Sequence, residues 1–91
     1  MELKYAFGQA LRELRMSKDL SQESIGASQS YVSDVERGLK TPSIEKLDEF
    51  ASTIGIHPVT ILAKSYLLKD RSLSPEDLMA LVRKELGMGD V

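Results

Sequence analysis

Three stretches of this 91-residue sequence begin with a serine suited to capping a helix and end at a glycine suited to stopping one. They are residues 28–38, 43–55 and 74–87, and each carries apolar residues at helical spacing. The third also has a proline at its first helical position and two acids in its first turn. No segment shows the alternation of a strand. This pattern predicts a chain built of short packed helices.

The rest of the sequence predicts three further helices. Residues 5–16 place apolar side chains at helical spacing, with Gly8 among them at a cost of about 1 kcal/mol relative to alanine. A very short helix starts at Ser21, with Ile25 as its core residue. Another starts at Pro58 and is apolar enough that we expect more than one of its sides to be covered. The expected fold is therefore all-α, with six helices.

The composition of the chain argues against several classes of protein. The chain has no cysteine and one histidine, so a disulfide is excluded and a metal site is not expected. The lone His57 precedes a proline and a helix, which favours a capping role, and no catalytic group accompanies it. No stretch resembles a membrane span or a secretory signal. We expect a cytoplasmic, nucleoid-associated protein that is not an enzyme and needs no cofactor or small-molecule ligand.

Residues 20–42, LSQESIGASQSYVSDVERGLKTP, read as two short helices joined by a tight turn. The second helix starts with two short polar side chains, Gln29 and Ser30. Such side chains at a helix N-terminus suit a helix that reads the major groove of DNA. The net charge is −2, so binding would depend on helix N-termini and neutral donors as well as on cations.

The runs SQE, SYVS, VERG and TPS in this order resemble the lambda-repressor/Cro-type helix-turn-helix family, often called XRE. The likeness covers about residues 7–66. Between Gln22 and Ser30 the chain is about four residues shorter than the commonest family pattern, which is about one turn of the first motif helix. The resemblance implies a five-helix DNA-binding domain over residues 1–69. Residues 70–91 would then form an additional C-terminal helix.

The resemblance also implies roles for individual residues. Base contacts are expected from Gln29, Ser30, Ser33 and Asp34. Contacts to the DNA backbone are expected from Gln22, Tyr31, Arg37, Lys40 and Thr41, and Gln22 also braces the second motif helix. Arg15 and Glu36 match a pair that forms a structural salt bridge in several family members. By their own chemistry, Ser33 could be a spacer and Asp34 could hold a neighbouring side chain.

The two C-terminal helices have two interpretations. Their apolar residues could complete the core, or they could form a homodimer interface. We expect a symmetric dimer, because one short reading helix with few cations binds weakly and two copies multiply its affinity. The expected interface residues are Ile61, Tyr66, Leu67, Leu78, Leu81 and Val82.

The expected function is a homodimeric transcriptional regulator of bacterial or phage type. It would bind double-stranded DNA at an inverted-repeat operator, read by the helix of residues 28–37. A restriction-modification controller protein or an antitoxin would share this fold and this DNA chemistry. A protein-interaction module with weak DNA binding is also compatible with the acidic pI of about 5.3.

Overall fold

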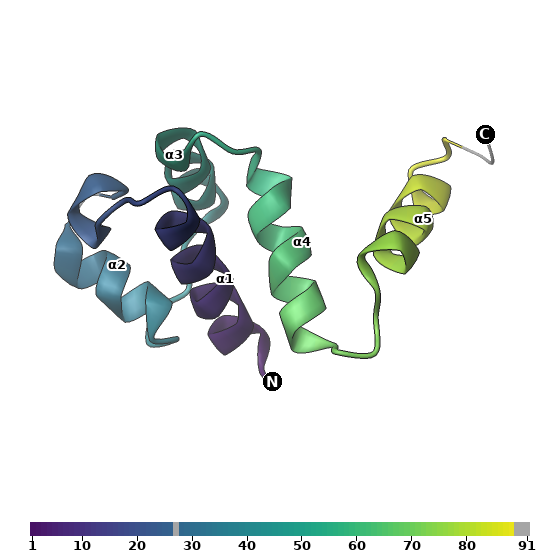
Figure 1. Ribbon diagram of the computed structural model, residues 1–91, viewed down its shortest axis with the longest axis horizontal. Coiled ribbons are helices and arrows are strands. Elements are labelled where there is room, and N and C mark those ends of the chain that lie inside the picture. The colour runs from purple at the N-terminus through teal and green to yellow at the C-terminus, as the bar shows by residue number, and fades with distance from the viewer. Residues whose placement is uncertain (27, 89–91) are drawn as a thin grey trace.

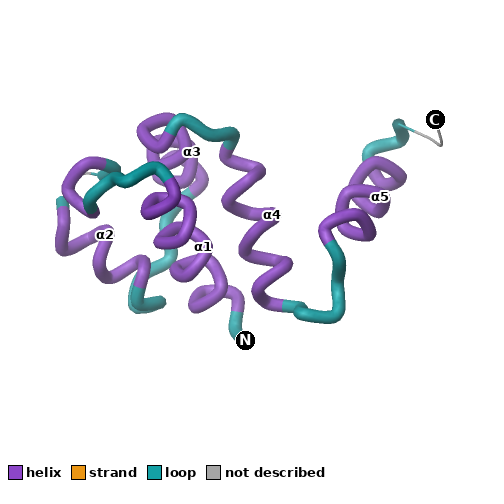
Figure 2. The backbone as a smooth tube through the Cα atoms, viewed as in Figure 1, coloured by secondary structure: helices purple, strands orange, loops and turns teal. Residues whose placement is uncertain are grey.

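The computed structural model describes residues 1–26 and 28–88. Five α-helices and one 3₁₀ turn follow one another along these residues, and no strand occurs among them (Figures 1 and 2). The elements are α1 (Leu3–Ser17), the 3₁₀ turn η1 (Gln22–Ser24), α2 (Gln29–Glu36), α3 (Ile44–Ile54), α4 (Pro58–Lys69) and α5 (Pro75–Glu85). The all-α prediction is confirmed.

The expected second helix is a single 3₁₀ turn. The Ser24 N–H donates to the Ser21 carbonyl at 3.1 Å, and the Ser21 and Ser24 hydroxyls pair at 2.8 Å, so Ser21 does not cap the turn with its side chain. Only four residues separate Ser21 from Gly26, which leaves room for little more than one helical turn. Ile25, directly after the turn, is buried as expected.

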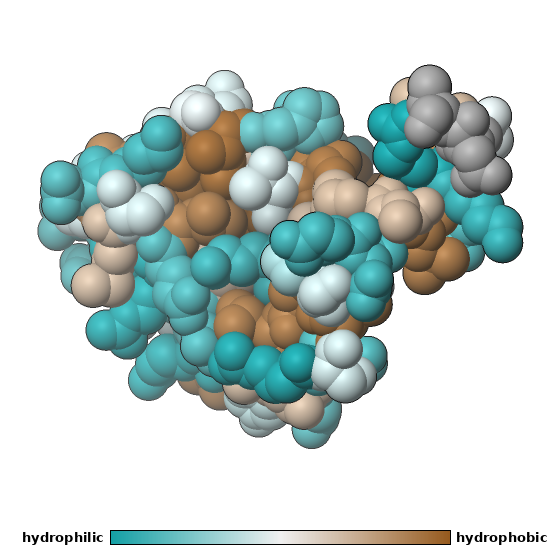
Figure 3. Space-filling view, turned by 45° about the vertical axis from the view of Figure 1, so that its right-hand side comes forward, coloured by the Kyte–Doolittle hydropathy of each residue, from teal (hydrophilic) through white to brown (hydrophobic). Residues whose placement is uncertain are grey.

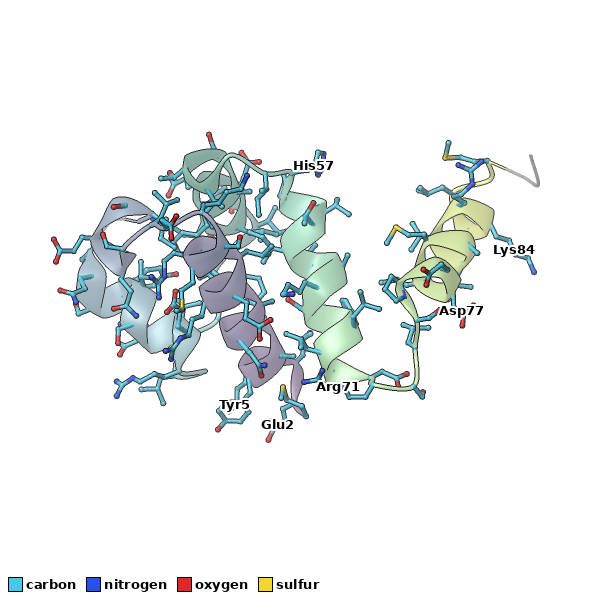
Figure 4. The ribbon with its side chains drawn as sticks, viewed as in Figure 1. Glu2, Tyr5, His57, Arg71, Asp77 and Lys84 are labelled. Atoms are coloured by element: carbon cyan, nitrogen blue, oxygen red, sulfur yellow. The ribbon has the colours of Figure 1, made fainter. Side chains whose placement is uncertain are left out.

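The other predicted helix ends are present. Each capping serine, Ser28, Ser43 and Ser74, accepts a backbone N–H through its hydroxyl, and the donors are those of Tyr31, Lys46 and Asp77. The glycines that end these three segments, at positions 38, 55 and 87, all have positive φ. His57 Nδ1 accepts the N–H of Val59 at 3.0 Å, so it caps α4 (Figure 4).

One hydrophobic core joins the first four α-helices and the residue after η1. Its fully buried centre includes Leu11, Phe50 and Ile61. The other buried members are Phe7, Ile25, Val32, Val35, Leu47, Ala51 and Ile54. The core therefore lies directly behind α2 and holds it from one side.

The prediction that Ile61 lies in a dimer interface is wrong. Ile61 is 0% exposed, because the α4 stripe of Ile61, Ser65 and Leu68 faces into the chain's own body. Ala6 and Ala10 of α1 form a second cluster with Leu68, and their small side chains let the two helices pack closely. The opposite side of α4, with Val59, Leu62 and Tyr66, stays exposed, so the described part of the chain covers α4 on one side only.

The C-terminal helix α5 lies apart from the other helices, on the side of α4 away from α1 (Figure 1). None of its residues is buried. The connector before it turns at Asp70, whose carboxylate accepts both the backbone N–H and the hydroxyl of Ser72. Within residues 1–26 and 28–88, no helix has the length and apolar character needed to cross a membrane.

Candidate nucleic-acid interface

Helix α2 lies at the edge of the molecule farthest from α5 (Figure 1). Val32 and Val35 bury its inner side in the core, and the Ser28 hydroxyl caps its first turn. Gln29 and Ser30 are exposed in that first turn, while Ser33 and Asp34 are half-buried. The N-terminus of α2 thus presents polar side chains to solvent, which is the chemistry of a groove-reading helix.

Helix α1 lies directly against the carboxyl end of α2. A Cβ atom on Gly8 would come within 2.5 Å of the Val35 carbonyl oxygen and 2.6 Å of the Glu36 carbonyl oxygen. One turn earlier in α1, the Tyr5 ring covers Gly38, where any Cβ would overlap the ring. These two glycines therefore set how closely α1 supports α2. The sequence identified Gly8 as an unfavourable residue inside a helix, whereas no sequence pattern predicted the contact of Tyr5 with Gly38.

An ion pair and its hydrogen bonds connect α1 to both ends of the helix-turn-helix segment, residues 20–42. Arg15 Nε donates to Glu36 Oε2 at 2.7 Å, and Arg15 Nη2 donates to Glu36 Oε1 at 3.0 Å. Arg15 Nη1 donates to the Leu20 carbonyl, and Gln22 Nε2 donates to Glu36 Oε1. The side chains of Arg15 and Glu36 are only 10% and 3% exposed. The hydrogen bond from Arg15 to Glu36 raises the pKa of Arg15, so the guanidinium stays charged.

Gln22 thereby braces α2 through Glu36, which is the bracing role that the family resemblance implied. Its amide is half-buried and lies between the start of the motif and the end of α2. The four-residue shortening of the motif leaves this link intact.

Asp34 holds two cations beside α2. Its carboxylate accepts from Arg37 Nη2 at 3.1 Å and lies 3.5 Å from Lys40 Nζ. The Lys40 ammonium also lies 5.6 Å from the centre of the Tyr31 ring. Arg37 and Lys40 remain more than half exposed, and Thr41 follows them in an exposed loop. Two cations therefore flank one carboxylate at the carboxyl end of α2.

An apolar hollow of about 350 Å³ lies next to this loop. It is enclosed by the start of α1, the loop between α2 and α3, the start of α3 and Leu62 of α4. Ile44, at its rim, is 81% exposed. Figure 3 shows apolar surface on the face that includes α4 and α5. Much of this apolar surface is left uncovered by a single copy of the chain.

Comparison with known proteins decides the family. The helix-turn-helix family model matches residues 11–61, more than half of the chain. This chain belongs to the XRE-type helix-turn-helix family. Proteins of this family are DNA-binding transcriptional regulators and not enzymes. The matched region ends within α4, so α5 lies outside it.

Individual relatives agree with this family. The control protein C.BamHI of Bacillus amyloliquefaciens is 31% identical over 65 residues, covering 66% of this chain and 80% of the relative. The immunity repressor protein of Bacillus phage phi105 is 30% identical over 95 residues, covering 91% of this chain and 66% of the relative. The crystal structure of the restriction-modification controller protein C.AhdI from Aeromonas hydrophila matches with a TM-score of 0.60 and 41% identity, covering 63% of this chain and 92% of that protein.

Proposed function

We propose that the protein is a homodimeric transcriptional regulator that inserts α2 into the major groove of an inverted-repeat operator. The observation that carries the proposal is the exposed pair Gln29 and Ser30 on the capped first turn of α2. Glutamine can pair bidentately with adenine, and serine can donate to or accept from several bases. Because both side chains point away from the core, they reach a base edge without any rearrangement of the fold.

The remaining site residues take supporting roles. Ser33, one turn farther along α2, is the next candidate for a base edge. Asp34 could accept from cytosine, but its engagement by Arg37 and Lys40 supports the second role, in which it positions these cations toward phosphates. Tyr31, Thr41 and the outward side of Gln22 complete the proposed backbone contacts.

The proposed dimer uses the exposed apolar residues of the C-terminal half. Leu81 is 48% exposed, Val82 is 37% exposed and Tyr66 is 45% exposed, while Leu67 and Leu78 are half-exposed. A second copy would remove these side chains from water and place two α2 helices on successive half-sites.

Specific observations bear on three alternatives. The similarity to C.BamHI and C.AhdI favours a controller of a restriction-modification operon as the biological setting. The similarity to the phage phi105 repressor favours a prophage setting. A protein-interaction module is disfavoured, because the outward side of α2 is polar where a protein-docking helix would present apolar residues.

The test is a salt-dependent binding titration on the DNA upstream of the protein's own gene, with random DNA of equal length as competitor. We expect Gln29→Ala/Ser30→Ala to weaken operator binding by about tenfold or more and to leave binding to random DNA unchanged. Ser52→Ala/Thr60→Ala, at exposed polar positions on α3 and α4, is the matched control. Equal operator affinity of the Gln29/Ser30 variant and the wild type would refute the role of α2.

A further inference from the structure

Helix α5 has an apolar stripe that the described residues 1–26 and 28–88 leave unburied. Leu78, Leu81 and Val82 lie at helical spacing, and none of them is buried. An isolated helix of 11 residues is marginal in water, even with the Ser74 cap and the stop at Gly87 that this one has. The stripe therefore needs something to cover it, and α5 lies outside the region that matches the family.

The charges that flank the stripe are self-complementary. Residues 76–84 read EDLMALVRK, so two acids precede the apolar centre and two bases follow it. At about 100° per residue, Asp77 and Lys84 fall on the same flank of the stripe, two turns apart. Figure 4 shows both side chains on the side of α5 turned away from α4. Neither of them forms an ion pair within the part of the chain that the structure describes.

We propose that α5 pairs antiparallel with α5 of a second copy, with Asp77 of each chain opposite Lys84 of the other. This proposal rests on the homodimer proposed above and specifies how its two copies meet. In the antiparallel arrangement, a two-fold axis crosses the pair near its centre and brings each acid to a base, twice per dimer. In a parallel pair the two-fold axis runs along the helices and puts these two flanks on opposite sides of the pair, so Asp77 of one chain would not meet Lys84 of the other. Charge therefore selects the antiparallel arrangement, and the Leu78, Leu81 and Val82 stripes cover each other at its centre.

Acids at the start and bases at the end of a helix also suit its dipole, so the charge pattern alone does not require a partner. Reversing the charge at one of these positions in each of two chains distinguishes pairing between copies from a simple match to the helix dipole. A chain with Asp77→Lys carries two bases on this flank, and a chain with Lys84→Asp carries two acids. Each repels its own copy, whereas the two variants attract each other.

The experiment is sedimentation equilibrium at micromolar concentration, on the full chain, at low salt. We expect each variant alone to dimerise about tenfold more weakly than the wild type, and an equimolar mixture to recover wild-type dimerisation as a heterodimer. The difference should shrink in 1 M salt. Glu76→Lys and Arg83→Glu make matched charge changes in the same turns but on the side opposite the stripe, and they should dimerise like the wild type.

Three results would overturn the proposal: single variants that dimerise as tightly as the wild type, a mixture that fails to recover, or a wild type that stays monomeric. If the wild type stays monomeric, α5 either covers the apolar hollow of its own chain or binds a different protein. The operator titration keeps this failure separate from failure of the proposed function. Wild-type protein that binds its operator while the charge variants dimerise normally leaves the DNA-binding role standing and removes only the α5 pairing.

Discussion

Gly8 of α1 lies against the carbonyl oxygen of Val35, so closely that a methyl group added there would come within 2.5 Å of that oxygen. This is the point at which the longest helix of the chain meets the end of α2. The backbone of α2, and not a side chain, forms the opposing surface, so neither side can easily give way.

Gly8→Ala should therefore destabilise the protein. Alanine improves helix propensity by about 1 kcal/mol, but the overlap with two backbone carbonyls should cost more, for a net loss of about 1–3 kcal/mol. Urea unfolding followed by circular dichroism measures the change. Arg12→Ala is the control, because it places alanine at an exposed position of the same helix. A Gly8→Ala variant more stable than the wild type would contradict the close approach of α1.

The ion pair of Arg15 and Glu36 should matter far more than the exposed pairs of Asp34. Glu36→Gln leaves a largely buried guanidinium without its carboxylate and should cost about 3 kcal/mol of unfolding free energy. Asp34→Asn breaks two exposed contacts and should cost less than about 1 kcal/mol. Arg15→Met/Glu36→Met, which removes both charges, should regain at least half of the loss. Similar losses for Glu36→Gln and Asp34→Asn would mean that burial does not strengthen the first pair.

The salt dependence of operator binding should report on Arg37 and Lys40. Each phosphate contact contributes about −0.9 to the slope of log affinity against log salt, and a dimer makes each contact twice. Arg37→Gln and Lys40→Gln should each reduce the slope by about two. Lys69→Gln, at the far end of α4, should leave the slope unchanged. A slope unaffected by both changes would place these cations away from the phosphates.

The connector before α5 should respond to acid. The hydroxyl of Ser72, followed by its backbone N–H, lowers the pKa of Asp70 below its ordinary value of 3.8. A carboxylate with a lowered pKa in the folded chain adds stability above its unfolded pKa, and this stability is lost as the pH falls through the folded pKa. Ser72→Ala should move the pKa of Asp70 up toward 3.8. Carbon NMR titration of the Asp70 carboxyl measures the shift, with Ser52→Ala as control, and an unmoved pKa would show that the Ser72 hydroxyl does not hold the carboxylate.

Structural features that depend on residues close together in the sequence could be predicted from it. The caps at Ser28, Ser43 and Ser74 and the stop at Gly38 follow from local backbone chemistry, and all are present. The contact of Arg15 with Glu36 joins residues 21 positions apart. Only the family resemblance suggested it, since helical spacing says nothing about which helices meet.

The orientation of α4 could not be predicted for a physical reason. Apolar side chains occur on several sides of this helix, so periodicity does not tell which side faces the core. The small side chains of Ala6 and Ala10 decide it, because Leu68 packs against them, and Ile61 on the same side of α4 then faces the core. The packing of Tyr5 on Gly38 was missed for a similar reason, since it joins an exposed ring to a turn far away in the sequence.

On α2, the residues that hold the helix and the residues that face outward are different. Val32, Val35 and the Ser28 cap support the helix, while Gln29 and Ser30 contribute nothing to the core. Substitutions at these two positions are therefore almost free of any stability penalty. With the base contacts proposed above for Gln29 and Ser30, a lineage carrying this fold would acquire a new target sequence in one or two mutational steps without compensating changes elsewhere. The same separation makes positions 29 and 30 the natural pair to randomise when redirecting the protein to a chosen DNA site.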